Sequence, residues 1–219
     1  MNRIYRYQRH FYDLTRKSFL FGRDELLRRM HIRRGDRVLE VGCGTARNLL
    51  KLHARHGHAQ LYGLDASTEM LATAQGKLRR RRLQDQVRLE HGLAEELADG
   101  RIFGAAKFDV IFFSYSLSMI PACTASIEAA LASLNPGGRI YIVDFGDQGG
   151  LPRFLRHALE RWLGLFGVKY RHELYEHLRA SEARGRGQLV TEGFALRYGI
   201  FAEFSTQPRE SSAPLAASA

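Results

Sequence analysis

The sequence of 219 residues predicts an α/β fold built on a doubly wound, seven-stranded sheet. Short apolar runs alternate with stretches of helical periodicity, which is the pattern of parallel strands joined by helical crossovers. A glycine turn directly follows the first apolar run, at the edge where such sheets bind their ligands. The last two apolar runs are separated by one residue and must therefore pair antiparallel. Together these observations predict a mainly parallel sheet that ends in an antiparallel hairpin.

The predicted elements divide the chain into one large domain and two flanking segments. Strands are expected at residues 37–41, 60–64, 86–90, 108–113, 138–144, 194–198 and 200–205, and helices near 45–56, 67–80, 124–134 and 152–180. Residues 35–206 form the main domain in this interpretation. Residues 207–219 are rich in Ser, Ala and Pro and are expected to be a disordered tail. Residues 1–34 place apolar and aromatic side chains at helical spacing among basic ones, which predicts an amphipathic helical segment. This segment either contacts a membrane or forms a lid over the cofactor pocket, and one helix could do both.

Composition and charge restrict the class of protein. The hydrophobic fraction of 45% and the aromatic fraction of 11% are those of a globular chain. Cys43 and Cys123 are too few for a disulfide framework or a zinc site, and we expect both to be reduced in the cytoplasm. No signal peptide or membrane span is expected. The net charge of +10 is concentrated in residues 1–34, where ten Lys or Arg face three acids. This predicts an anionic partner, either a nucleic acid or a lipid surface.

The most informative motif is the glycine turn after the first strand. Glu40 stands two residues before Gly42, and Cys43 and Gly44 complete the turn into the next helix. Glycines let the backbone approach a ligand closely. The carboxylate of Glu40 repels a pyrophosphate but attracts an ammonium group, and Arg47 replaces the third glycine of a dinucleotide motif. S-adenosylmethionine, with its cationic amino-acid end and its adenosine, is the ligand that fits both features.

The second strand ends at Asp65, where an acid binds the two ribose hydroxyls of a nucleotide cofactor. We therefore interpret Asp65 as the ribose ligand rather than as a surface acid that caps a helix. Ala66 follows it in the same loop. Ser67 is expected to cap the next helix, with Met70 turned inward beside the cofactor.

Side chains beyond the fourth and fifth strands are the candidates for the acceptor site. Ligands of such sheets lie beyond the carboxyl ends of the strands, so Ser114 and Tyr115 should face donor and acceptor. Asp144, at the end of the fifth strand, either orients an acceptor amine or caps the next helix. The helix expected after it carries Trp162 among more apolar residues than one face can bury. This excess indicates a substrate lid or a corner that touches a membrane, in addition to core packing.

Two stretches of the sequence resemble a known family. Tyr-Arg-Tyr-Gln-Arg-His-Phe-Tyr-Asp-Leu-Thr-Arg (residues 5–16), followed by Phe-Gly-Arg-Asp (21–24), resembles the opening of the bacterial betaine-lipid N-methyltransferases. Ser-Tyr-Ser-Leu-Ser-Met-Ile-Pro (114–121) resembles the segment after their fourth strand. These enzymes methylate diacylglyceryl-homoserine to diacylglyceryl-trimethylhomoserine. The resemblance covers residues 3–205. It implies a Rossmann-like class I methyltransferase fold with S-adenosylmethionine as cofactor. It also implies a lipid substrate and peripheral attachment to an anionic membrane surface at the inner face of the cell membrane.

The resemblance also implies roles for single residues. Tyr12 matches a residue that related enzymes use to bind the carboxylate of the donor. Leu93 replaces the usual acid beside the adenine, so an adenine near Leu93 and Ala94 is expected to be held by backbone atoms or by another side chain. The ring of Tyr115 is the first choice for stabilising the growing methylammonium charge, ahead of Tyr5, Tyr7 and Tyr198. The catalytic candidates are thus Tyr115, Tyr12 and Asp144.

Several alternatives stay open at this point. Phosphatidylethanolamine N-methyltransferases are similar enough to fit the same motifs. An RNA or protein methyltransferase would suit the basic charge, although this chain has Ser-Tyr-Ser-Leu where methylases of nucleic-acid amines typically carry Asn/Asp-Pro-Pro-Tyr/Phe. A membrane-bound module that binds the donor without catalysis also fits the glycine turn. Accordingly, a lipid rather than a nucleic acid is expected as the partner, and the sequence leaves the head group, the number of methyl groups and the oligomeric state open.

Overall fold

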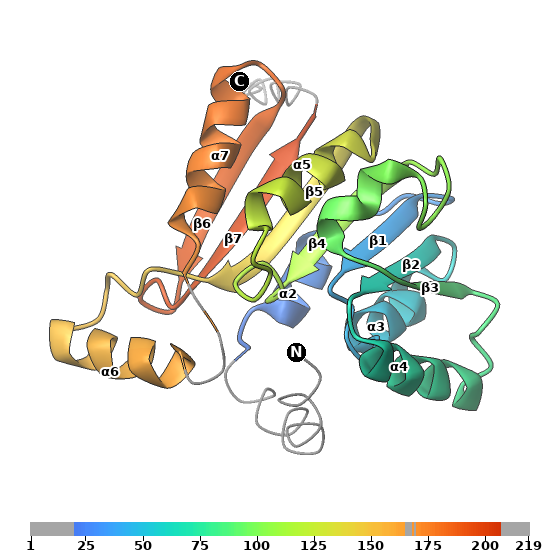
Figure 1. Cartoon of the computed structure of the whole chain (residues 1–219), viewed down its shortest axis with the longest axis horizontal. Coiled ribbons are helices and arrows are strands. Elements are labelled where there is room, and N and C mark those ends of the chain that lie inside the picture. The colour runs from blue at the N-terminus through green and yellow to red at the C-terminus, as the bar shows by residue number, and fades with distance from the viewer. Residues whose placement is uncertain (1–19, 165–167, 169, 207–219) are drawn as a thin grey trace, which may run out of the picture.

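The computed structural model describes residues 20–164, 168 and 170–206, and its centre is a single sheet (Figure 1). The strand order is β3-β2-β1-β4-β5-β7-β6. The first five strands are parallel, and β7 runs antiparallel between β5 and β6. The strands are β1 (Arg37–Val41), β2 (Gln60–Asp65), β3 (Val87–His91), β4 (Phe108–Ser114), β5 (Leu134–Phe145), β6 (Gln188–Phe194) and β7 (Gly199–Ser205). The predicted seven-stranded sheet with an antiparallel terminal hairpin is confirmed.

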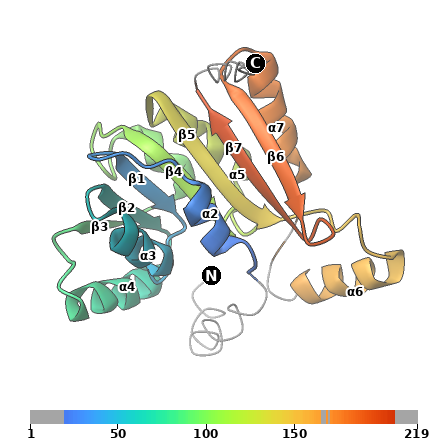
Figure 2. The same ribbon diagram turned by 180° about the vertical axis from the view of Figure 1, so that it is seen from behind.

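Helices cover both faces of the sheet (Figures 1 and 2). One face packs against α2 (Arg23–Arg29), α3 (Arg47–His56) and α4 (Thr68–Arg80). The other packs against the 3₁₀ helix η1 (Ala94–Asp99), α5 (Cys123–Ala132) and α7 (His172–Ala183). A further helix, α6 (Arg153–Gly164), follows β5. Among the described residues, none of the helices has both the length and the apolar character needed to span a bilayer.

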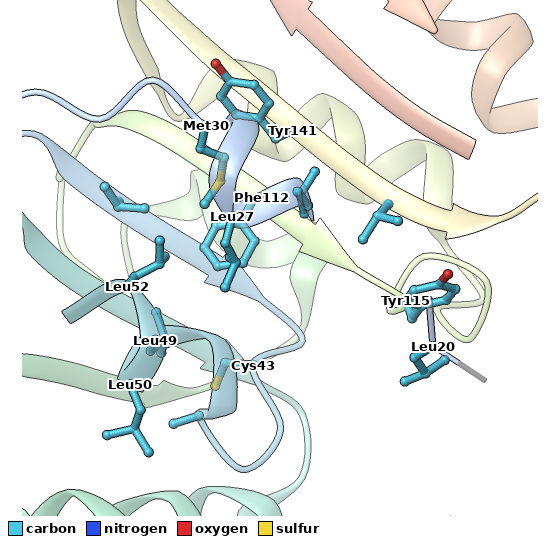
Figure 3. Packing of buried hydrophobic residues seen from close by; sticks show 14 of the residues in the cluster. Leu20, Leu27, Met30, Cys43, Leu49, Leu50, Leu52, Phe112, Tyr115 and Tyr141 are labelled. Atoms are coloured by element: carbon cyan, nitrogen blue, oxygen red, sulfur yellow. The ribbon is translucent and has the colours of Figure 1, made fainter. Parts of the chain in front are cut away.

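The alternation of side chains along the strands explains why both faces carry helices. Val110 and Phe112 of β4 point into the cluster under α2 and α3, whereas Ile111 and Phe113 point into the cluster under α5. All four are buried, as expected for a parallel strand covered on both sides. Figure 3 shows how Leu27 of α2 meets Phe112 on the first of these faces.

The topology places a ligand site between β1 and β4. From β1 the chain moves outward through β2 and β3, and it then returns to the other side of β1 to form β4. Such a reversal opens a crevice beyond the carboxyl ends of the two strands that flank it. The glycine turn follows β1, and Ser114 is the last residue of β4, so both predicted motifs meet at this crevice.

The structure confirms one predicted helix cap and corrects the bounds of two predicted elements. Ser67 does cap α4, because its hydroxyl accepts a hydrogen bond from the backbone N–H of Met70 at 3.3 Å. The single helix expected over 152–180 is wrong: α6 ends at Gly164 and α7 begins at His172. The predicted strand 194–198 is also wrong. Its residues 195–198 form the turn between β6 and β7, and three successive residues there, Ala195, Leu196 and Arg197, have positive φ.

The two flanking segments lie largely outside the described residues. Only residues 20–34 of the predicted amino-terminal segment are described, and they contain α2. The predicted tail 207–219 lies outside them entirely. Both assignments therefore stay predictions.

Candidate active site

The glycine turn is shaped by two close approaches to the backbone. Gly42 has a φ of +76°, and a Cβ built on it would lie 2.5 Å from the Cβ of Ser116. Gly44 has a φ of +52°, and a Cβ built on it would meet no atom within 4 Å. The first glycine is therefore required by its protein neighbour, whereas the second faces open space where a ligand can approach.

Asp65 lies between the glycine turn and the start of α4. Its Oδ2 accepts a hydrogen bond from Gly44 N–H at 2.7 Å, and its Oδ1 accepts one from Ser67 N–H at 2.8 Å. The turn itself is tied to β2, because the N–H groups of Gly42 and Cys43 both donate to the carbonyl of Leu64. A carboxylate can accept about four hydrogen bonds, so Asp65 keeps capacity for ribose hydroxyls.

Glu40 is the most unusual group of the site. Its side chain is buried, and Oε1 accepts a hydrogen bond from Asn48 Nδ2 at 2.6 Å. Oε2 is also buried and has no hydrogen-bond partner among the described residues. Burial raises the pKa of Glu40 to about 8, and the nearby charge of Asp65 acts in the same direction. The hydrogen bond from Asn48 and the positive charges of Arg23 and Arg47 act against this increase. A buried carboxylate oxygen without a partner is a strong acceptor for a ligand's ammonium group.

The adenosine side of the crevice is lined by apolar groups. Leu93 is 43% exposed beside the end of β3, whereas Ala94 and Met70 are buried. The loop after β2 is held in place by His91, whose Nε2 lies 3.2 Å from the carbonyl oxygen of Ala66. Cys43 turns its thiol inward, where a Cβ on Gly63 would lie 2.9 Å from the sulfur. Only the backbone of Cys43 thus borders the ligand side of the turn.

An aromatic cluster lies at the carboxyl ends of β4 and β5, on the side where the acceptor is predicted to bind. Its members are Tyr115, Phe145, Tyr198 and Phe21, which come from four separate segments of the chain. The Tyr115 and Phe145 rings are 4.8 Å apart, Phe145 and Tyr198 are 5.7 Å apart, and Phe21 and Tyr198 are 5.8 Å apart, all edge to face. Tyr115 adjoins Ser116, which touches Gly42, so the aromatic cluster borders the glycine turn.

Tyr115 is held in an uncommon backbone conformation. Its φ is +56°, which is rare for a bulky residue and costs about 1–3 kcal/mol. Its N–H donates to the Val143 carbonyl at 2.8 Å, and its hydroxyl donates to the Phe21 carbonyl at 2.5 Å. Figure 3 shows its ring beside Leu20, at the entrance to α2. Burial raises the pKa of the Tyr115 phenol far above its ordinary range, so the hydroxyl stays protonated.

The other two predicted acceptor-side residues lie close to Tyr115. Ser114 has a buried hydroxyl that finds no hydrogen-bond partner in the described part of the chain. Asp144 is buried, and its two oxygens accept backbone N–H bonds from Ser118 at 3.0 Å and from Phe145 at 2.8 Å. Asp144 therefore holds the loop after β4 against β5. Its contact with an acceptor amine stays a prediction, and the predicted donor ligand Tyr12 lies outside the described residues.

Three residues of the site did not emerge from the sequence. Asn48 reaches Glu40 from the first turn of α3. Arg23 at the start of α2 acts electrostatically on both Glu40 and Tyr115. Phe145 joins the aromatic cluster from the end of β5. Asn48 could have been found, because it follows the glycine turn on the first helical turn, whereas Arg23 and Phe145 depend on long-range packing.

A cavity of about 330 Å³ lies elsewhere, between α7 and the β6–β7 hairpin. Tyr170, Tyr175, Arg179 and Arg197 are among the residues that line it. None of the described residues of the glycine turn or of the aromatic cluster takes part. In the described ranges, moreover, no three His, Cys, Asp or Glu side chains come together as a metal site.

Comparison with known proteins identifies the kind of chain to which this geometry belongs. A family profile described as a methyltransferase domain matches residues 38–138. Demethylmenaquinone methyltransferase of Geobacillus kaustophilus (strain HTA426) is 31% identical over 197 residues, which cover 87% of this chain and 78% of that protein. The enzyme of the same name from Geobacillus sp. (strain WCH70) is 28% identical over 145 residues, and the match spans 56% of its length.

A solved structure shows the same fold. Phosphoethanolamine N-methyltransferase 2 of Haemonchus contortus, in complex with S-adenosyl-L-methionine, gives a TM-score of 0.65 at 16% identity, over 86% of this chain and 52% of that chain. The expected cofactor, S-adenosylmethionine, is confirmed by the matched domain and by this complex. The two sequence relatives carry the demethylmenaquinone name and not that of the betaine-lipid enzymes, so they support the expected chemistry at the level of a methyltransferase.

Proposed function

The chain belongs to the class I S-adenosylmethionine-dependent methyltransferases, and on that premise we propose that it methylates an amine in the head group of a membrane lipid. The proposed acceptor is diacylglyceryl-homoserine, and phosphatidylethanolamine is the alternative. The resemblance of residues 5–16 and 114–121 to the betaine-lipid enzymes supports this choice of acceptor. The proposal also places the protein at the inner face of the cell membrane.

The aromatic cluster is the observation that carries the proposal. Methylation of an amine creates a permanent or protonated ammonium group beside the donor. Faces of aromatic rings attract such a cation by about 0.5–2 kcal/mol each. The ring of Phe145 lies 4.8 Å from that of Tyr115, next to the glycine turn, and 5.7 Å from that of Tyr198. Tyr115 and Phe145 are each 3% exposed, so an amine acceptor that reaches a face of these rings would gain stabilisation as its charge grows.

On the donor side, each residue has a distinct task. When bound, S-adenosylmethionine supplies a methyl group on a cationic sulfur, which is left as a neutral thioether once the acceptor nitrogen has taken the methyl. Glu40 is placed to accept the ammonium of the donor through its unpaired Oε2. Asp65 is placed to accept the ribose hydroxyls, and Leu93 offers apolar contact to the adenine. The apolar and unpaired groups of the crevice thus fit this cofactor.

On the acceptor side, the residues position the amine rather than take its proton. The Tyr115 hydroxyl is protonated and donates to the Phe21 carbonyl, so it does not serve as a base. Asp144 is buried, and its two oxygens hold the loop after β4 through the backbone N–H groups of Ser118 and Phe145. We infer that the amine enters deprotonated and that the rings align its lone pair, because positioning alone supplies much of the acceleration in a direct displacement. The rate of methyl transfer should then rise with pH until the deprotonated amine predominates.

A quinone or another planar ring is the second candidate acceptor. The two sequence relatives are named demethylmenaquinone methyltransferases, and rings of the aromatic cluster could also contact a flat substrate. A quinone has no amine nitrogen, so its methylation forms no ammonium group. The two candidates therefore differ in whether cation stabilisation by Tyr115 matters.

A donor-consumption assay separates these acceptors. Purified protein and labelled S-adenosylmethionine are mixed with vesicles carrying diacylglyceryl-homoserine, phosphatidylethanolamine or a demethylated quinone, and with bulk RNA. Label in the homoserine lipid, lost in Asp65→Ala, is the expected result. Label in the quinone alone would overturn the proposal in favour of the second candidate. Label in RNA alone, or donor binding without turnover on any acceptor, would also contradict it.

A further inference from the structure

The surface of α6 differs from that of the other helices. Only Leu163 of its twelve residues is buried, whereas Phe154 is 73% exposed, Leu155 46% and Trp162 39%. Figures 1 and 2 show α6 standing apart from the sheet, beyond the end of β5 and beside the turn between β6 and β7. A helix of a globular protein normally turns such residues into the core. The exposed apolar side chains of α6 thus form an apolar surface on the described part of the chain.

The β6–β7 turn adds a fourth apolar side chain on the same edge. Leu196 is 63% exposed at the tip of this turn. Its carbonyl accepts a hydrogen bond from Gly150 N–H at 3.2 Å, just before α6 begins. We call Phe154, Leu155, Trp162 and Leu196 the α6 surface.

Basic side chains accompany the α6 surface. The helix carries Arg153, Arg156 and Arg161 against one acid, Glu160, which pairs with Arg156 at 3.2 Å. Arg197 follows Leu196 in the turn and pairs with Asp147. Exposed apolar residues flanked by arginines are typical of helices that lie in the interface of an anionic bilayer. A chain with a net charge of +10 would be attracted to the same surface.

The α6 surface also lies on the acceptor side of the active site. Phe145, a member of the aromatic cluster, ends β5, and the next residue, Gly146, donates its N–H to the carbonyl of Tyr198 at 2.8 Å. The segment 146–152 then leads directly into α6. A bilayer in contact with α6 would therefore lie close to the acceptor side.

We propose that α6 docks this protein on anionic phospholipid membranes, with the α6 surface inserted at the level of the head groups. This inference deepens the proposed function and rests on it, because a lipid acceptor must be reached from the bilayer. The occupant is a lipid surface rather than a protein, since the arginines on α6 complement anionic head groups.

The only tryptophan of the chain, Trp162, reports directly on this docking. Full-length protein is titrated with phosphatidylcholine vesicles with and without phosphatidylglycerol. With phosphatidylglycerol we expect a blue shift of the emission, quenching by brominated acyl chains, and weaker binding in high salt. No shift with anionic vesicles, or an equal shift with neutral ones, would overturn the inference.

Variants test whether α6 carries the binding. Leu155→Ser should weaken vesicle binding at least about fivefold, whereas Val190→Ser, on an equally exposed residue of β6 (42%), should leave it unchanged. Arg153→Gln and Arg161→Gln should each weaken binding to anionic vesicles about fivefold. Because all four side chains are exposed or flank exposed ones, the fold should persist, and circular dichroism checks it. Binding that survives Leu155→Ser and both arginine variants would assign docking to another segment.

Further measurements distinguish membrane docking from self-association of the chain and from the proposed methyltransferase function. Self-association in ultracentrifugation that disappears in Leu155→Ser, without vesicle binding, would assign the α6 surface to a second copy of the chain and overturn the inference. Turnover of a water-soluble homoserine ether without vesicle binding would leave the proposed function standing while the docking fails. Vesicle binding without methylation of any lipid amine would support docking and contradict the proposed function.

Discussion

The donor and acceptor sides of the crevice are built by different means. On the donor side, Glu40, Gly44 and Asp65 lie within 26 residues of sequence, and the N–H of Gly44 donates directly to Asp65. On the acceptor side, the aromatic cluster gathers rings from positions 21, 115, 145 and 198, which only the complete sheet brings together. Because a short segment determines the donor side, many chains can share it. We therefore expect the acceptor side to differ among such chains and to determine their choice of substrate.

The largest effects are expected at the glycine turn. In Gly42→Ala the new Cβ would lie 2.5 Å from Ser116 at a φ of +76°, so we expect a loss of stability of about 3 kcal/mol and at least about 100-fold weaker donor binding. Thermal unfolding and calorimetric titration with S-adenosylmethionine measure the two effects. Gly44→Ala is the matched variant: with open space around its Cβ it should lose only about 1 kcal/mol of stability but still bind the donor poorly. Equal stability losses in both would contradict the division of tasks between the two glycines.

Glu40→Gln tests the electrostatics of the donor side. The pKa of Glu40 is raised to about 8 in the folded protein, above its usual 4.5, so between these values the folded state keeps a proton that the unfolded state has lost. Glu40 therefore makes the free protein less stable as the pH rises from 4.5 towards 8, by up to about 5 kcal/mol. The Gln variant should lose this slope and bind the donor about 10–100-fold more weakly.

The raised pKa of Glu40 also leads us to expect that a proton is released when the donor binds. An ammonium beside Glu40 favours the ionised carboxylate, so donor affinity should increase with pH up to about 8. Titration at pH 7 in buffers of different ionisation enthalpy should show protons leaving the wild-type complex. The control is Glu40→Gln, in which the contribution of this carboxylate should vanish; an unchanged proton count would place the titrating group elsewhere.

Tyr115 tests the acceptor side alone. Tyr115→Leu removes the ring and should lower kcat about 2–30-fold on an amine acceptor, with donor affinity unchanged. Tyr115→Phe keeps the ring but loses the bond to the Phe21 carbonyl, and we expect a smaller decrease. Steady-state kinetics and donor titration provide both readings. A decrease in donor affinity that matches the decrease in kcat would mean that the two sides are not separable.

The smallest effect is expected at Asp24, which links α2 to α3. Its carboxylate pairs with Arg47 at 2.9 Å and with Lys51 at 2.5 Å, and although desolvation acts against them these bonds lower its pKa to about 2. A lowered pKa contributes stability above the ordinary value of 3.8, and this contribution is lost as the pH falls towards 2. Since the side chains are largely exposed, Asp24→Asn should cost less than about 1 kcal/mol at neutral pH. Denaturant unfolding at pH 7 and at pH 3 checks that the difference shrinks with acid.

The contrast between the two sides also explains what the sequence could predict. The glycine turn, Asp65 and the Ser67 cap follow from residue types at fixed local spacing, and the structure places them together. The break between α6 and α7 and the true position of the β6–β7 turn were missed, because apolar periodicity continues through both. The turn in particular relies on Ala195, Leu196 and Arg197 in the left-handed region, where glycine or asparagine would have been the usual signal.

The hydrogen bonds that fasten α2 have a consequence for the order of folding. Tyr115 reaches the Phe21 carbonyl across 94 positions, and Tyr141 accepts from His31 N–H across 110. Contacts of such long sequence separation form late, since the loop between them must close first. Although α2 leaves the ribosome before any strand, it can dock only after β4 and β5 have been synthesised and paired. We therefore expect the β4–β5 side of the crevice to form before α2 packs against it.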